Sequence, residues 1–209
     1  MRPIRSLPAV LLVLAGACAE SPTDALSPDA ASPAAVVVPA CVEFGPPPAV
    51  GASWGGPLGT IPGSTVLVEN AVRVYTNTFF WLGGGSTYNL MRIEPSFGGF
   101  GSGPQIARSN NINIGFDYAN VGFVVRTVKF EWLDLGGNEN LSVNGSPVFI
   151  GELDSPPAVL GGVAVAATSV AVAGGDRGTI TLTAPTTGAI KRFEVGGQEL
   201  WIDRVCAWP

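Results

Sequence analysis

Apolar and polar residues alternate along short segments of the chain, and glycine-rich turns separate these segments. Alternation with a period of two is typical of a β-strand with one buried face, whereas an amphipathic helix needs apolar residues at spacings of three and four. The helical spacing is nearly absent after Cys41. About a dozen strands are therefore predicted, at residues 41–44, 65–68, 72–75, 78–82, 88–93, 112–118, 123–133, 141–143, 163–172, 179–183, 190–195 and 199–206.

Turn residues support this division into strands. Gly83-Gly84-Gly85 permits positive φ at low cost, and Asn144-Gly145 is the strongest hairpin signal in the chain. A domain of about 170 residues with so many short strands buries their apolar faces best as two packed sheets. The prediction is an all-β fold, an antiparallel β-sandwich or jelly roll, in which residues 41–209 form one domain.

Two segments carry more detailed expectations. In segment 123–133 we expect one alternating set to face the core, with its arginine paired or extended to solvent: Val124, Arg126, Val128, Phe130 and Trp132. The stretch from Pro95 to Gln105 is rich in glycine, which weakens strands, so we expect a long surface loop there.

Composition narrows the classes of function. The 209 residues contain no His, which excludes His-based acid–base catalysis, Ser-His-Asp and Cys-His nucleophiles, and His-ligated metals. Only 13% of residues are charged against 46% hydrophobic, so the chain is not a charged disordered protein. The net charge of −5 disfavours contact with a phosphate backbone, and no nucleic-acid partner is expected.

The N-terminus has the features of a secretory signal over residues 1–17: Arg2 and Arg5, a short apolar run, and small residues before Cys18. The run is shorter than the ~20 apolar residues that span a bilayer, which disfavours the alternative of a transmembrane anchor. Residues 18–40 are rich in Pro, Ser, Ala and Asp without periodicity, and they are predicted to be a flexible tether.

The segment Leu14-Ala15-Gly16-Ala17-Cys18 resembles a bacterial lipobox. The resemblance implies that Cys18 is acylated and that the protein is an extracytoplasmic lipoprotein of the outer membrane or cell surface, with the membrane as its partner. Ala15 stands where lipoboxes usually have Leu. An ordinary small-x-small cleavage site is the alternative.

Three cysteines are present, and unpaired thiols are unusual in an oxidising compartment. If Cys18 carries lipid, Cys41 and Cys206 remain as a pair that brackets almost the whole predicted domain. A disulfide between them is predicted, and two free thiols are the alternative.

Three segments of the chain resemble β-sandwich domains of bacterial lipoproteins and exoproteins. They are CVEF near the start, FEWLDLGGNENLSVNG in the middle and FEVGGQELWIDRVCAW at the end. Those domains are similar to galactose-binding-like jelly rolls, which include many carbohydrate-binding modules. The resemblance implies a first strand beside the last and a structural Ca²⁺ held by an acid on each. Glu43 and Asp203 match those positions. The alternatives are solvent-facing acids, or Asp203 paired with Arg204 or Arg73.

A second acidic segment lies in the middle of the chain, with Asp134, Asn138, Glu139 and Asn140 within seven residues. The spacing of these oxygen-bearing residues weakly resembles that of a calcium-binding turn. Asp and Asn also favour turns through local hydrogen bonds, and we favour that simpler interpretation.

Aromatic residues beside glycine-rich loops are the candidate ligand-binding residues: Trp54, Trp81 and Tyr88. Core packing is the alternative for each of them. Paired carboxylates can hydrolyse glycosides, but no spacing places any two of the available acids together: Glu94, Glu131, Glu139, Glu152, Asp154 and Glu199. The chain is therefore predicted to bind a glycan or other surface polymer rather than to act as an enzyme. A structural envelope or adhesion protein is the second hypothesis, and a carboxylate-dependent glycan-degrading enzyme is the third.

Overall fold

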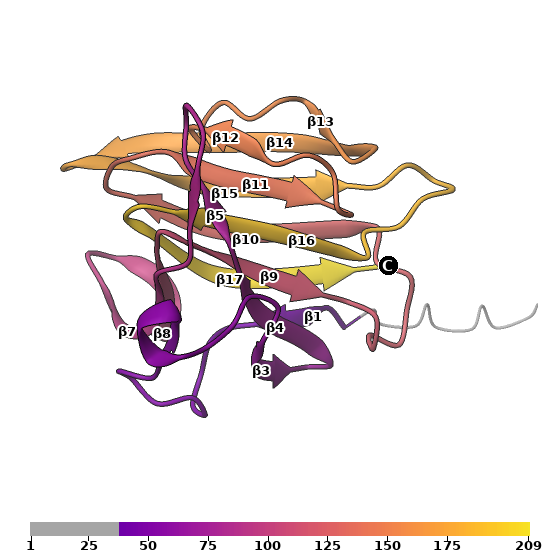
Figure 1. The fold of residues 1–209 in the computed structure, drawn as a ribbon. Helices are drawn as coiled ribbons and strands as arrows, with labels where there is room; N and C mark the ends of the chain where they lie inside the picture. The colour runs from indigo at the N-terminus through magenta and orange to yellow at the C-terminus, as the bar shows by residue number, and fades with distance from the viewer. Residues whose placement is uncertain (1–37) are drawn as a thin grey trace, which may run out of the picture. The chain divides into compact units, whose positions relative to one another are not determined.

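The computed structural model describes residues 38–209, and these residues contain two main antiparallel sheets (Figure 1). The predicted signal peptide, the anchor residue Cys18 and the tether up to residue 37 lie outside the described residues. One sheet has nine strands, in the order β13 (Val159–Leu160), β14 (Val163–Val172), β15 (Gly175–Thr183), β10 (Thr127–Asp134), β17 (Leu200–Trp208), β8 (Phe100–Asn110), β7 (Leu90–Phe97) and β2 (Ser53–Gly55), with β1 (Ala40–Val42) also beside β17.

The second sheet has six strands, in the order β12 (Phe149–Gly151), β11 (Glu139–Val143), β16 (Arg192–Gly197), β9 (Ile112–Asp117), β4 (Val72–Asn77) and β3 (Thr65–Glu69). A separate hairpin joins β5 (Phe79–Phe80) to β6 (Ser86–Thr87). The helical content of residues 38–209 is one 3₁₀ turn, Gly56–Leu58, and no helix there is long and apolar enough to cross a membrane. The predicted all-β sandwich is confirmed.

Alternating apolar side chains from both sheets fill the space between them. Phe130 on β10 stacks on Phe193 of β16, with ring centroids 5.1 Å apart, and Phe193 stacks in turn on Phe116 of β9 at 4.8 Å. All three rings are fully buried. This aromatic stack joins the two sheets across the centre of the core.

The expectation for segment 123–133 holds within β10 and fails before it. Val128, Phe130 and Trp132 face the core as predicted, but Val124 is 56% exposed. The strand begins only at Thr127. Arg126 precedes it and donates hydrogen bonds to backbone carbonyls, including that of Gly188 at 2.9 Å. The alternation therefore cannot be extended back to residue 124.

The predicted loop at 95–105 is wrong, because most of this stretch belongs to the β7–β8 hairpin. Backbone pairing continues through Pro95 opposite Gln105, and Gly98 and Gly99 form the turn with positive φ. Phe100 and Ile106 are buried against Leu133, Trp201 and neighbouring apolar residues on the outer face of the nine-stranded sheet. Burial in this second, smaller core compensates for the weak strand propensity of the glycines.

Strand β17 connects the two ends of the domain. Cys41 on β1 lies directly opposite Cys206 on β17, with a Cα–Cα distance of 4.0 Å, and the two form the predicted disulfide. The same edge of β17 pairs with β8 through Leu200–Ile202, and Arg204 adopts φ 49° between the two pairings. The disulfide suggests an oxidising, extracytoplasmic environment.

Candidate functional site

The end of the sandwich next to the β10–β11 connection carries acidic side chains between the sheets. Phe130, Trp132 and Asp134 occupy alternate, inward-facing positions of β10. The chain then crosses to the six-stranded sheet and begins β11 with Glu139, which shares its face with the buried Leu141. Because side chains alternate across a strand, the strand period directs both carboxylates into the interior.

Glu152 completes this cluster from a third element. It follows β12, whose Gly151 pairs with Glu139 on β11. One carboxylate oxygen each from Asp134, Glu139 and Glu152 lies within 4.8 Å of the other two. Asp134 and Glu139 are buried, whereas Glu152 is exposed. We call these three residues the end cluster.

Hydrogen bonds satisfy the end cluster only in part. Glu139 Oε2 accepts a hydrogen bond from the backbone N–H of Leu153 at 3.3 Å, and Asp134 Oδ1 accepts one from Gly136 at 3.0 Å. Glu139 Oε1 is buried without a hydrogen-bond partner. Such an oxygen loses its hydration on folding without full compensation.

The electrostatics of the end cluster are strongly unfavourable for ionised carboxylates. Burial, followed by the charges of Asp134 and Glu152, raises the pKa of Glu139 to about 9. Burial also raises the pKa of Asp134, with a further contribution from Asp176, and the pKa of Glu152 is raised in the same direction. A proton or a cation is needed to hold these groups together at neutral pH.

This arrangement could hold a metal ion. A hard cation such as Ca²⁺ prefers carboxylate and carbonyl oxygens. Glycoside hydrolysis by the same carboxylates is disfavoured, because Glu139 has 0% of its surface exposed and a polymer cannot reach it.

From the sequence, Asp134 and Glu139 are possible calcium ligands but a simple turn is favoured, and nothing there connects them with Glu152. Asn140, expected beside them, points away and makes two hydrogen bonds with the backbone of Phe80, at 2.7 and 2.9 Å. Glu152 lies thirteen residues after Glu139, and only the pairing of β11 with β12 brings it close. No local spacing signals that contact.

Glu43 and Asp203 do come together, as the sequence predicted. The Ser102 hydroxyl lies between them, 2.6 Å from Glu43 Oε2 and 3.0 Å from Asp203 Oδ2, and the Ser102 N–H also donates to Oδ2 at 2.6 Å. Asp203 is fully buried and its Oδ1 has no partner. Burial raises the pKa of Asp203, and the charge of Glu43 adds to this shift.

The alternatives to a cation at Glu43 and Asp203 were solvent-facing acids or a salt bridge of Asp203 with Arg204 or Arg73, and the observed burial and salt bridges can be compared with each. Asp203 is not solvent-facing, whereas Glu43 is half-buried. Arg73 forms its salt bridge with Asp117 at 3.5 Å, and Arg204 forms one with Glu131 at 3.3 Å. Burial also raises the pKa of Glu69, whose carboxylate accepts a hydrogen bond from the Glu43 N–H. A cation at Glu43 and Asp203 stays a prediction.

The three aromatic candidates lie on separate segments and are each half-buried. Trp54 and Tyr88 pack against the main core, and the Tyr88 hydroxyl shares a 2.7 Å hydrogen bond with Thr76. Trp81 packs edge-on against Phe79 with ring centroids 5.2 Å apart. These contacts explain each side chain through packing, and a role in ligand binding stays a prediction.

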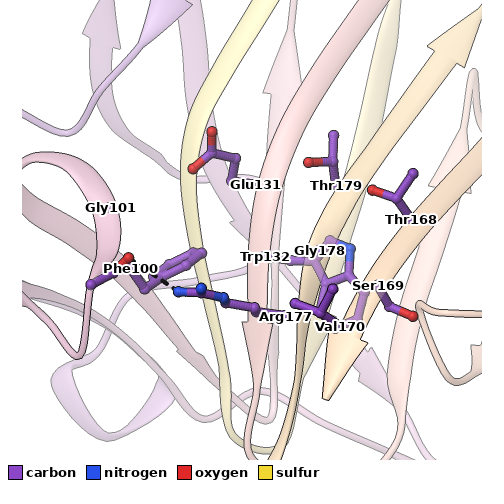
Figure 2. A pocket seen from close by; sticks show the side chains of 11 residues that line it. Phe100, Gly101, Glu131, Trp132, Thr168, Ser169, Val170, Arg177, Gly178 and Thr179 are labelled. Carbon is purple, nitrogen blue, oxygen red and sulfur yellow. Dashed lines mark hydrogen bonds between the residues drawn. The ribbon is translucent and has the colours of Figure 1, made fainter. Parts of the chain in front are cut away.

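A groove of about 350 Å³ lies on the outer face of the nine-stranded sheet. Figure 2 shows Glu131, Thr179 and Thr168 in a row across three strands, as expected from their register on β10, β15 and β14. Arg177 borders the groove and donates a hydrogen bond to the backbone carbonyl of Gly99 at 3.2 Å, which ties the tip of the β7–β8 hairpin to this face.

A smaller hollow of about 140 Å³ lies toward β17, and Glu131 lines both hollows. It is lined by Lys129, Glu131, Arg204, Cys206 and Trp208. Trp208 is the last residue of β17, and its side chain is half-buried. We call the two hollows together the outer-face groove. Its lining residues are scattered between positions 99 and 208, so no motif in the sequence could reveal it.

No known protein family, curated protein or solved structure matches this chain.

Proposed function

We propose that this protein is an extracytoplasmic binding module that holds a glycan or another hydroxyl-rich surface polymer along the outer-face groove. The observation that carries the proposal is the sharing of Glu131 by two adjoining hollows. We interpret the two hollows as one track across β17, β10, β15 and β14. A track, unlike a closed pocket, can accommodate several units of a chain.

The chemistry of the groove supports a sugar-like ligand. Sugar hydroxyls both donate and accept hydrogen bonds, and the groove offers a carboxylate acceptor in Glu131, guanidinium donors in Arg177 and Arg204, and two threonine hydroxyls. Trp208 adds an aromatic surface at one end. Glu131 forms a salt bridge with Arg204, and Lys129 and Arg177 leave the groove with an excess of positive charge, so it suits glycans with acidic groups as well as neutral ones.

The rest of the chain supports placement at a membrane surface. A lipid on Cys18 would leave residues 18–40 as a tether between the membrane and the sandwich. Removal of residues 1–17 leaves 9 basic and 16 acidic residues, a net charge of −7, which disfavours nucleic acids as partners. A structural Ca²⁺ at Glu43 and Asp203, as in the jelly rolls that the chain resembles, is part of this proposal.

The proposal gives the module a binding role and no catalytic one. A glycan array and affinity electrophoresis with residues 19–209 test it directly. Glu131→Gln and Trp208→Ala should each weaken binding to the retained polymer by about five- to tenfold, the effect of one hydrogen bond or aromatic contact. Val68→Ala, an exposed apolar position on β3 of the other sheet, is the matched control and should leave binding unchanged.

Two results would contradict the proposal. Binding that survives both groove variants would move the site away from this face, and Trp54, Trp81 and Tyr88 would become the next positions to test. A failure to retain any glycan or surface polymer would favour the second hypothesis, a structural envelope protein without a small ligand.

A further inference from the structure

We propose that the end cluster of Asp134, Glu139 and Glu152 is a Ca²⁺ site that fastens the two sheets at the end of the sandwich. The three carboxylates come from different parts of the fold: the end of β10, the start of β11 and the segment after β12. A cation among them would therefore join the nine-stranded sheet to the edge strand β12 of the six-stranded sheet and to its neighbour β11. The inference is independent of the proposed polymer binding.

Two separate observations support an ion at this position. The first is geometric, because carboxylate oxygens of the three residues lie within 4.8 Å of one another, a separation that one ion can bridge. The second is the fully buried Glu139 side chain, whose Oε1 has no hydrogen-bond partner while Oε2 has only the Leu153 N–H. A buried carboxyl oxygen without a hydrogen-bond partner is the kind of group that a metal ion satisfies.

The surroundings of the end cluster add negative charge. Asp176 lies directly opposite Asp134 on the neighbouring strand, and its charge acts on both Asp134 and Glu152. Glu199 acts on Asp134 in the same direction. Glu152 is exposed, so an ion can enter from solvent past this side chain.

The donor set selects the class of metal. All candidate ligands are oxygens, and the chain has no His that would favour zinc, copper or nickel. Ca²⁺ accepts six to eight oxygens in flexible geometry and tolerates several carboxylates, whereas Mg²⁺ demands a near-octahedral shell and keeps its waters. Ca²⁺ is therefore the expected ion.

A shared proton is the competing explanation, and Glu139→Gln separates it from Ca²⁺. If a neutral Glu139 donates a hydrogen bond to Asp134, glutamine preserves that neutral donor, and the wild type should bind no Ca²⁺ at this position. If Ca²⁺ is bound, removing one anionic ligand should weaken binding at least tenfold. Asp154→Asn is the matched control, because it removes an exposed charge two residues from Glu152 that lies outside the end cluster.

The experiment uses residues 19–209 stripped with a chelator and then titrated with CaCl₂ by calorimetry, with Tb³⁺ luminescence as a local readout. Trp132 precedes Asp134 by two residues on the same inward face, about 7 Å along the strand, and should sensitise bound Tb³⁺. Wild type and Asp154→Asn should bind Ca²⁺ and show luminescence that Ca²⁺ displaces. Glu139→Gln should lose this signal, and Trp132→Phe should lose the luminescence but keep the heat of Ca²⁺ binding.

Either of two results would overturn the assignment: absence of Ca²⁺ binding heat in the stripped wild type, or unchanged Ca²⁺ affinity and luminescence in Glu139→Gln. Circular dichroism of each variant in chelator distinguishes loss of binding from loss of folding. If Glu139→Gln does not fold, Glu152→Gln at the exposed position gives the same test without a change in the core.

Discussion

Asp134 on β10 and Asp176 on β15 lie directly opposite each other across an antiparallel strand pair. Like charges at this position repel and destabilise a sheet by roughly 0.2–1 kcal/mol. We expect Asp176→Asn to raise the melting temperature in chelator by about 1–4 °C. With saturating Ca²⁺ the gain should shrink, because the ion already compensates the repulsion. Calorimetry in both conditions checks this, and a lower melting temperature in chelator would contradict it.

The Cys41–Cys206 disulfide closes a loop with a sequence separation of 165 residues. Cross-links over long loops restrict the unfolded chain most, and the loss of a native disulfide typically costs about 2–5 kcal/mol. We expect urea denaturation of the Cys41→Ala/Cys206→Ala variant to show a loss of this size. Strand β1 has only three residues, so its amides should also exchange faster with solvent. Equal unfolding midpoints for the oxidised protein and the variant would contradict the prediction.

Strand alternation was enough to predict the sandwich, and the cysteine count was enough to predict the disulfide. The alternation repeats along the chain, and the disulfide depends on only a few residues. The proximity of Glu43 to Asp203 followed from their placement beside the two cysteines and from the resemblance to calcium-bearing jelly rolls. Ser102, which lies between the two carboxylates, could not be anticipated, because it was assigned to a loop that is a strand.

The missed features all depend on tertiary contacts. The β7–β8 hairpin is stabilised by Phe100 and Ile106 packing on Leu133 and Trp201, and this burial overrides the weak strand propensity of its glycines. The same fold-back brings Gly99 next to Arg177 and so forms one wall of the outer-face groove. Glu152 joins the end cluster only through the pairing of β12 with β11.

The lipid anchor is tested at Cys18. Mass spectrometry of the membrane fraction should find a mature chain that begins at Cys18 and carries a diacylglyceryl group on its sulfur. If Cys18 is lipidated, Cys18→Ala should shift the protein to the soluble fraction, because the variant would lack the two acyl chains that bind the bilayer. A mature chain that begins at another residue, or at an unmodified Cys18, would support ordinary cleavage instead.

The predicted cation at Glu43 and Asp203 is tested by Asp203→Asn. A cation that binds only the folded state stabilises it by RT ln(1 + [L]/Kd), about 2.7 kcal/mol at a hundredfold excess over Kd. Loss of one anionic ligand should reduce the Ca²⁺-dependent rise in melting temperature while the disulfide keeps the strands joined. Performing the titration in the Glu139→Gln background removes the contribution of the end cluster. If Asp203→Asn leaves the remaining calcium dependence unchanged, no cation binds at this pair.

The raised pKa of Asp203 also leads us to expect that the free energy of unfolding depends on pH in the absence of metal. Its folded-state pKa is raised, mainly by burial and further by Glu43, so the folded chain binds this proton more tightly than the unfolded chain. The resulting stabilisation is complete below pH about 4, near the unfolded pKa, and is lost as the pH rises through the folded-state pKa. The amide introduced by Asp203→Asn cannot titrate. In chelator, the free energy of unfolding of the wild type minus that of Asp203→Asn should therefore decrease as the pH rises above about 4. Urea denaturation at several pH values measures this difference, and a difference that increases with pH would mean that Ser102 stabilises the carboxylate more than burial destabilises it.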